Sequence, residues 1–327
     1  MHPELFRIPF TDLTVKSYGL LMVCGFISAI YIIRRLSRDL GEHSEHITTA
    51  ALYSLIAGVV GARIFYVIHY WPQFRGKGIM EIFAVWKGGL ELLGGVLLAI
   101  FIIVGYLWTK KLPVRRYLDI LGIGLMLALA FGRLGCFMNG CCFGRPTDCS
   151  VSVRFPYASL AYQSQVRPDL ARHRETPHLE LPMDFFDADF DNNYYLKSYD
   201  SLNSQQKLEA TEGPYRCLPV IPTQIYESLL AFAGCVILYF HRQRGIKLQK
   251  QGKKLPFLFR PGITFSLMFV IYGTMRFFIE FLRDDNPIQA DGLTISQNLS
   301  IMLVVVNLGL IFLFAKMKTD NFTFNKS

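Results

Sequence analysis

Seven long apolar stretches constrain the fold of this chain more than any other feature of its sequence. Each approaches the roughly 20 residues that a helix needs to cross the hydrocarbon core of a bilayer. Only 18% of the 327 residues are charged, whereas soluble domains carry about a quarter. We therefore predict an all-α integral membrane protein with seven transmembrane helices, at Tyr18–Ile33, Ile47–His69, Gly88–Trp108, Tyr117–Phe137, Pro222–Phe240, Gly262–Leu282 and Ile295–Ala315.

Lysine and arginine are distributed unevenly over the loops, and this predicts the orientation. They gather after the first, third and fifth apolar stretches and in the C-terminal tail, whereas the N-terminal stretch and the remaining short loops hold few. Because cytoplasmic loops are enriched in basic residues, we expect the N-terminus outside and the C-terminus in the cytoplasm. The net charge of +9 then reflects topology and attraction to anionic lipids, not a nucleic-acid partner.

The loop between the fourth and fifth stretches is much longer than the others. Residues 144–220 are predicted to form an extracytoplasmic insertion between a four-helix part, 1–143, and a three-helix part, 221–327. The insertion contains an acidic and aromatic stretch at residues 183–191. The sequence leaves open whether it is a small folded head or a loosely ordered loop.

Charged residues inside the apolar stretches mark a candidate site. Each costs about 2.5–3.5 kcal/mol at the centre of a membrane helix, so such residues usually serve a function. They lie toward the outward helix ends: Arg63, Arg133, Glu227, Arg276, Glu280 and Arg283. With Tyr272, the last three share one helix face, because their spacings are four, four and three residues. Two interpretations stay open: ion pairs that hold the helices together, or a polar cavity whose arginines bind a lipid phosphate.

The fourth apolar stretch ends in a glycine-rich segment, residues 132–145, with the sequence GRLGCFMNGCCFGR. Four glycines and Asn139 within it predict a helix that breaks at the outer interface. Irregular backbone is tolerated at that depth only where it lines a cavity or is buried in protein, and free backbone N–H groups bind phosphate oxygens. The alternative is an ordinary helix C-cap followed by a loop.

Seven cysteines are present, and several lie at the two ends of the insertion. We expect a disulfide between Cys217 and one of Cys141, Cys142 and Cys149, since such bonds form in oxidising compartments; the sequence does not fix the connectivity. Cys141, Cys142 and Cys149 with His173 also suggest a metal site, but their spacing matches no strong zinc pattern. We therefore expect no metal.

In order and position, these motifs resemble the prolipoprotein diacylglyceryl transferase family over nearly the whole chain. The resemblance rests on Pro3–Phe6, Ser17–Leu20, Gly61–Tyr66, Trp86–Gly89 with Gly94 and Gly95, the segment 132–145, Pro222–Ser228, Arg260–Gly262 and Tyr272–Arg283.

The resemblance implies an enzyme of the bacterial inner membrane. It would transfer the diacylglyceryl group of phosphatidylglycerol to a cysteine thiol in a preprolipoprotein signal peptide, forming a thioether and releasing glycerol phosphate without a cofactor. By the resemblance, Arg133 and Arg276 would be essential at the headgroup. The predicted substrate-binding residues are Tyr18, Arg63, Asn139, Gly144, Gln224, Glu227, Tyr272 and Glu280.

Three positions depart from the family pattern. Leu93 stands where a His is usual, Cys136 replaces a common Asn, and Cys141 replaces a common Glu. A histidine base is therefore absent at that position, and the acceptor thiol needs another means of activation. Two alternatives follow: a non-catalytic membrane transporter of lipids or anions, and an inactive member of the same family.

Overall fold

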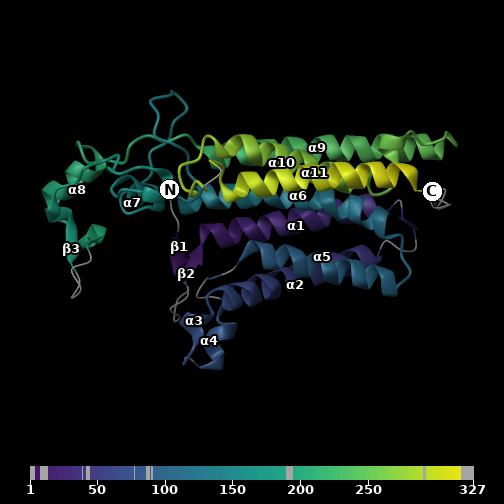
Figure 1. Cartoon of the computed structure of the whole chain (residues 1–327), viewed down its shortest axis with the longest axis horizontal. Helices are drawn as coiled ribbons and strands as arrows, with labels where there is room; N and C mark the ends of the chain where they lie inside the picture. The colour runs from purple at the N-terminus through teal and green to yellow at the C-terminus, as the bar shows by residue number, and fades with distance from the viewer. Residues whose placement is uncertain are drawn as a thin grey trace. The chain divides into compact units, whose positions relative to one another are not determined.

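The computed structural model describes residues 4–7, 14–38, 40–41, 45–76, 78–85, 89, 91–188, 194–289 and 292–317. Seven long helices correspond to the seven apolar stretches (Figure 1): α1 Ser17–Ser37, α2 Glu45–His69, α5 Leu92–Thr109, α6 Val114–Asn139, α9 Thr223–Lys250, α10 Ile263–Glu280 and α11 Ile295–Lys316. Among the described residues, six are long and apolar enough to cross a membrane, and α5 contributes a shorter apolar segment, Gly94–Thr109. The helical membrane protein is confirmed, while the seventh span and the orientation stay predictions.

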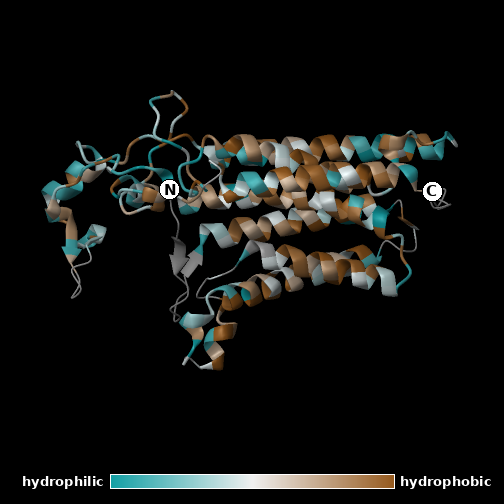
Figure 2. Cartoon of the chain, viewed as in Figure 1, coloured by the Kyte–Doolittle hydropathy of each residue, from teal (hydrophilic) through white to brown (hydrophobic). Residues whose placement is uncertain are grey.

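Short elements connect the long helices. Strands β1 Glu4–Arg7 and β2 Thr14–Lys16 pair antiparallel, as do β3 Phe186–Ala188 and β4 Tyr194–Leu196. The short helices are α3 Trp71–Phe74, α4 Ile79–Phe83, α7 Leu160–Gln165 and α8 Ser204–Thr211, with 3₁₀ turns η3 Leu170–Arg172, η4 Met183–Phe185, η5 Tyr199–Ser201 and η6 Phe257–Phe259. Figure 2 shows the difference in composition: the long helices are mostly apolar, whereas α8 is hydrophilic.

Helix α9 continues ten residues beyond its predicted end at Phe240. The extension is rich in arginine, lysine and glutamine, which are good helix formers. Lys247 and Lys250 in its last turn also stabilise the helix, because their positive charges interact favourably with the negative end of the helix dipole. The first break comes at Gly252, whose φ is +68°. The end of an apolar run therefore did not mark the end of the helix.

By its internal contacts the chain forms two compact units. The first comprises Met1–Ser28, Leu125–Tyr239 and Ser266–Leu310, and the second comprises Ala29–Gly124, Phe240–Phe265 and Ile311–Ser327. The predicted division at residues 143 and 220 follows membrane topology instead of contacts, and it stays a prediction.

In the second unit, α2 and α5 lie side by side (Figure 1). Glycines on both helices make this possible: a Cβ on Gly61 would lie 2.5 Å from the Gly94 carbonyl oxygen, and one on Gly95 would lie 2.6 Å from that of Gly58. Small residues let the backbones of membrane helices approach closely, which favours van der Waals packing.

Asp119, a charged residue within α6, also has a structural role in the second unit. Its carboxylate accepts hydrogen bonds from the backbone N–H groups of Gly262, at 2.8 Å, and Phe265, at 2.9 Å. It thereby satisfies donors at the start of α10 that have no partner within that helix.

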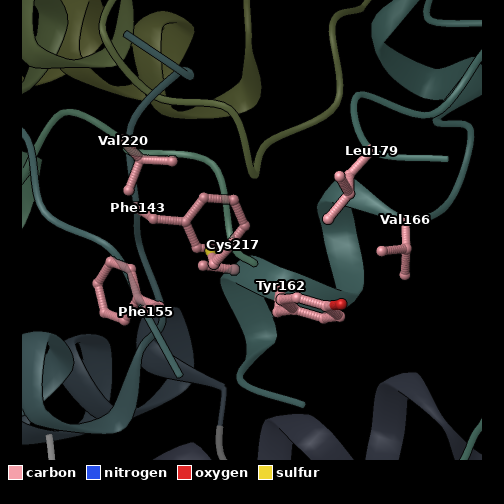
Figure 3. Close-up of a cluster of buried hydrophobic side chains, with 8 residues drawn as sticks. Phe143, Phe155, Tyr162, Val166, Leu179, Cys217 and Val220 are labelled. Carbon is pink, nitrogen blue, oxygen red and sulfur yellow. The ribbon is translucent and has the colours of Figure 1, made fainter. Parts of the chain in front are cut away.

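The described part of the insertion is a folded head, which decides between the two alternatives. Figure 3 shows one of its apolar clusters, in which Phe143, Phe155, Tyr162, Val166, Leu179, Cys217 and Val220 are buried. A second cluster contains Phe185, Leu202 and Ala210. Two polar side chains inside the head are paired with the backbone: the Gln165 side chain bonds both backbone groups of Leu218, and the Tyr162 hydroxyl donates to the Tyr215 carbonyl at 2.7 Å.

Candidate active site

Helix α6 ends later than its glycines predicted. Gly132 and Gly135 are helical, and the break comes only after Asn139. Gly140 then adopts φ +72°; its N–H donates to Phe137 O and that of Cys141 donates to Cys136 O, both at 3.2 Å. This is the Schellman pattern of a glycine-terminated helix, so the C-cap alternative is confirmed.

The same turn gathers three thiols. A Schellman turn places the residue after the glycine beside the third residue from the helix end, here Cys141 beside Cys136. Cys142 follows with φ +60°, an uncommon value for a residue other than glycine. The sulfur atoms of Cys136, Cys141 and Cys142 all lie within 4.8 Å of one another.

A buried carboxylate on α9 connects arginines from different segments. Glu227, 1% exposed, accepts a hydrogen bond from Nη1 of Arg276 at 2.9 Å and forms an ion pair with Nε of Arg133. Nη1 of Arg283 lies 3.6 Å from the same carboxylate. A buried charge without a partner costs several kcal/mol, so Glu227 stabilises the arginines that surround it.

Glu280, on the last turn of α10, is the second buried carboxylate. Nη2 of Arg276 approaches it to 2.7 Å and also donates to the Ser296 hydroxyl at 3.0 Å. Glu280 further accepts hydrogen bonds from Thr294, at 2.8 Å, and Asn286, at 2.5 Å. Five of the six charges predicted inside the apolar stretches thus meet in one network, which we call the arginine–glutamate network: Arg133, Glu227, Arg276, Glu280 and Arg283. Because α10 ends at Glu280, the prediction that Arg283 shares its helix face is wrong, and Arg283 reaches the network from the turn that follows.

The network contains ion pairs, as the first interpretation predicts, yet it leaves donors available. A guanidinium carries five N–H groups. Among the described residues, Nη2 of Arg133 and Nε of Arg276 have no partner. Nη1 of Arg133 donates to the Cys142 sulfur at 3.6 Å, and the Arg133 side chain is 16% exposed. An anion that approaches Arg133 therefore finds unused donors.

The network and the thiols also affect the ionisation of Cys142. Its pKa lies well below the usual value for a thiol, because the Cys136 and Cys141 thiols hydrogen-bond to it and because Arg283 and Arg133 are close. Stabilisation of a thiolate by neighbouring donors and cations is the expected physical effect.

Backbone contacts hold the loop that follows α10. Gly144 N–H donates to Ile221 O at 3.0 Å, and Arg145 N–H donates to Leu282 O at 2.9 Å. A Cβ on Gly144 would lie 2.6 Å from Ile221 O and 2.8 Å from Leu282 O, so glycine is required for this approach. Gly144 was predicted to bind substrate, and the structure gives it a packing role.

The head also holds this loop through Arg172. Its guanidinium donates to the carbonyls of Arg283, at 2.9 Å, and Asn286, and lies 3.2 Å from the Asp284 carboxylate. The insertion thus positions the segment that carries Arg283, a connection that the sequence did not predict.

The first turn of α9 holds the cysteine loop. The Thr223 hydroxyl donates to Cys142 O at 2.6 Å, and the Gln224 amide donates to Cys141 O at 2.7 Å. The side-chain oxygen of the buried Gln224 has no donor among the described residues.

Other predicted site residues of the first unit lie around these groups. The Tyr18 ring packs against Gly135, where a Cβ would lie 2.9 Å from Tyr18 Cδ2. Asn139 is the exposed last residue of α6, and Tyr272 is half-buried one helical turn before Arg276.

Arg63 belongs to the second unit, where its guanidinium donates to three backbone carbonyls. These are Glu81 at 2.6 Å, Ile82 at 2.8 Å and Gly89 at 2.9 Å. It thus holds the segment that follows α2, and its predicted contact with substrate stays a prediction. A small cleft in this unit, lined by Arg116, Asp119, His241 and other residues, contains none of the predicted site residues.

The predicted disulfide is not formed in this structure, which contains all seven cysteines as free thiols. Cys217 is buried in the head, where its thiol donates to the Gln165 side-chain oxygen at 3.4 Å. Burial raises the pKa of this thiol to about 11. Cys149 is exposed, and the thiols that lie close together are those of Cys136, Cys141 and Cys142. This arrangement differs from the predicted disulfide to Cys217. It also differs from the suggested metal set of Cys141, Cys142, Cys149 and His173.

Some predicted features lie outside the described residues. They are Pro3, the Trp86–Gly88 motif, the Leu93 side chain and part of the acidic stretch. Conversely, sequence reasoning missed Arg172, Asn286, Thr294 and Ser296. The polar residues directly after α10, ahead of an apolar helix, were the available signal.

Fold and site together define a helical membrane protein with a buried, arginine-rich polar site. A profile of the prolipoprotein diacylglyceryl transferase family matches residues 3–313. The chain belongs to this family of transferases.

Two relatives named phosphatidylglycerol–prolipoprotein diacylglyceryl transferase illustrate the similarity. One, from Lactobacillus delbrueckii subsp. bulgaricus, is 27% identical over 318 residues, which cover 97% of this chain and 92% of the relative. Another, from Streptococcus pyogenes serotype M1, is 27% identical over 312 residues, 95% of each chain.

Proposed function

We propose that this chain transfers the diacylglyceryl group of phosphatidylglycerol to the cysteine thiol of preprolipoprotein signal peptides. A thioether forms, and glycerol phosphate leaves. The observation that carries the proposal is the arginine–glutamate network in a chain of this family. Family membership favours this activity over a non-catalytic transporter of lipids or anions.

The chemistry requires a stabilised leaving group. The acceptor sulfur attacks the glycerol carbon that carries the phosphate ester, and the carbon–oxygen bond breaks, so negative charge grows on the departing phosphate. Preorganised donors at such a position typically provide the largest contribution to catalysis. The unused N–H groups of Arg133 and Arg276 are suited to this role, which we assign to them as catalytic residues.

Carboxylates keep these arginines in position. Glu227 contacts both guanidinium groups, and Glu280 contacts Arg276. Each arginine retains at least one N–H that has no partner among the described residues, so a phosphate oxygen would bind without displacing the carboxylates. Glu227 and Glu280 are positioning residues in this account.

The remaining polar residues are proposed to recognise the phosphatidylglycerol headgroup. The unpartnered Gln224 oxygen would accept a hydrogen bond from a hydroxyl of the terminal glycerol. Tyr18, Asn139 and Tyr272 are proposed to line the same site. Arg63 is proposed to contact substrate as well.

The membrane arrangement is part of the proposal. Seven spans, an outward N-terminus, an extracytoplasmic insertion and a cytoplasmic C-terminus in the bacterial inner membrane would place the arginine–glutamate network toward the outer leaflet. The basic residues of the loops after α1, α5 and α9 support this orientation.

Complementation tests the proposed function. Bacteria depleted of their own transferase receive this chain, and lipoprotein lipidation is followed by mass spectrometry of a reporter lipoprotein. We expect the parent and a Lys110→Ala control to restore lipidation and Arg276→Lys to fail. If the parent accumulates in the membrane and the reporter stays unmodified, the proposal is wrong for this chain and an inactive family member is the better description.

A further inference from the structure

The three gathered thiols of Cys136, Cys141 and Cys142, which we call the thiol trio, have no role in the proposed function above. Two of them stand where the family pattern has other residues. Their sulfur atoms lie mutually within 4.8 Å, and Thr223 and Gln224 hold the backbone carbonyls of the loop that carries two of them.

The arrangement fits a metal ion better than a disulfide. A tetrahedral zinc ion binds thiolates at about 2.3 Å, which places the sulfur atoms about 3.8 Å apart. The trio therefore needs to contract by at most about 1 Å, within the reach of side-chain rotation. A disulfide would use two sulfurs and leave the third without a role.

The surrounding charges favour a thiolate complex. Three thiolates and one divalent zinc ion carry a net charge of about −1. Arg133 already donates to the Cys142 sulfur at 3.6 Å. Hydrogen bonds and cations around metal-bound sulfurs are the usual supporting shell of such sites.

We infer that the thiol trio binds a zinc ion through Cys136, Cys141 and Cys142, with the fourth coordination position open to the acceptor cysteine. Soft thiolate ligands select zinc among the available divalent ions, and three protein ligands with one open position are typical of catalytic zinc. Binding of the metal rests on the geometry alone, whereas activation of the acceptor rests on the proposed function.

The zinc site would activate the acceptor thiol in place of the histidine base that is absent at Leu93. A thiol that coordinates zinc loses its proton, which passes to solvent. The bound sulfur then attacks the glycerol carbon of phosphatidylglycerol, the sulfur–carbon bond forms, and the carbon–oxygen bond breaks. The electron pair leaves with glycerol phosphate, and the thioether, a weaker ligand, dissociates from the zinc.

Metal analysis of the full chain in detergent tests the inference. Purified parent protein is expected to contain about one zinc per chain, and a Cys136→Ser, Cys141→Ser, Cys142→Ser triple variant none. Cys149→Ser is the matched control, because Cys149 is exposed and outside the trio. Cobalt(II) replaces zinc as a probe, and the parent is expected to show thiolate-to-cobalt charge-transfer bands that shift when a signal peptide with a single cysteine is added.

The rate provides a further readout. Below its pKa of about 8.5, the ionised fraction of a free acceptor thiol rises roughly tenfold for each unit by which the pH is raised. The rate of glycerol phosphate release by zinc-loaded parent protein is expected to depend weakly on pH. After a chelator has removed the zinc, the rate is expected to rise steeply with pH, as the ionisation of a free thiol does.

The outcomes separate the two claims. Parent protein that retains no zinc or cobalt above the level of the triple variant, or that contains a disulfide within the trio, overturns the inference. Zinc bound by the trio without glycerol phosphate release refutes the proposed function and leaves the metal site intact. Cobalt charge-transfer bands that do not shift when the peptide is added would refute the role of the metal in activating the acceptor thiol.

Discussion

Replacement of Arg276 by lysine tests the arginine–glutamate network most sharply. The guanidinium contacts Glu227 through Nη1 and Glu280 and Ser296 through Nη2. Lysine keeps the charge but carries one nitrogen on a flexible stem, so it cannot span both carboxylates and still donate to a phosphate. Loss of one well-placed transition-state donor costs about 3 kcal/mol, or about 10²-fold in rate. We expect the same for Arg133→Lys.

The assay measures glycerol phosphate release by purified variants supplied with phosphatidylglycerol and a single-cysteine signal peptide. Lys110→Ala is the control, because Lys110 is an exposed residue at the C-terminal end of α5. Thermal unfolding checks that each variant is folded. Rates above about half of the parent rate in both lysine variants would show that the arginines are structural, and the reasoning about phosphate would be refuted.

Three further predictions follow from particular residues. Gly144→Ala should lower the free energy of unfolding by about 2 kcal/mol through overpacking, as measured by thermal unfolding. The control Gly105→Ala should leave stability unchanged, because nothing lies within 4 Å of a Cβ at that position. Equal stability of the two variants would refute the packing role of Gly144. Cys217, whose pKa of about 11 leaves it protonated at pH 8, should resist maleimide until the protein is denatured, and a requirement for reductant would instead show a disulfide. In a Cys149→Ser background, which removes the exposed native thiol of the head, membrane-impermeant maleimide on intact cells should label Ser204→Cys but not Gln251→Cys, and the opposite pattern reverses the topology.

The long helices were predictable because membrane spans satisfy their own backbone hydrogen bonds and therefore require long apolar runs. The ends of the helices were less predictable than their positions. The α9 extension from Phe240 to Lys250 crosses from apolar to basic sequence and continues through Gly245 without a proline, and hydropathy alone does not report the continuation. The head was predicted only as an insertion, because its clusters join residues far apart in the sequence.

The site was predictable where it depended on spacing along one helix. Arg276 and Glu280 are four residues apart on α10 and pair as expected. The thiol trio depends on the glycine turn at Gly140, and the Asn139–Gly140 sequence was its signal. Arg63 shares a predicted depth with the other charges, yet depth along a helix does not fix which neighbours a side chain contacts.

Transfer of label from phosphatidylglycerol to peptide tests the central claim most directly. Purified parent protein receives phosphatidylglycerol labelled with carbon-13 in its diacylglycerol part, with a signal peptide that contains one cysteine or its serine counterpart. We predict that mass spectrometry finds the labelled diacylglyceryl group on the cysteine peptide alone, with unlabelled glycerol phosphate released in equal amount. Label that stays entirely in phosphatidylglycerol, with folded protein in the assay, would contradict the account.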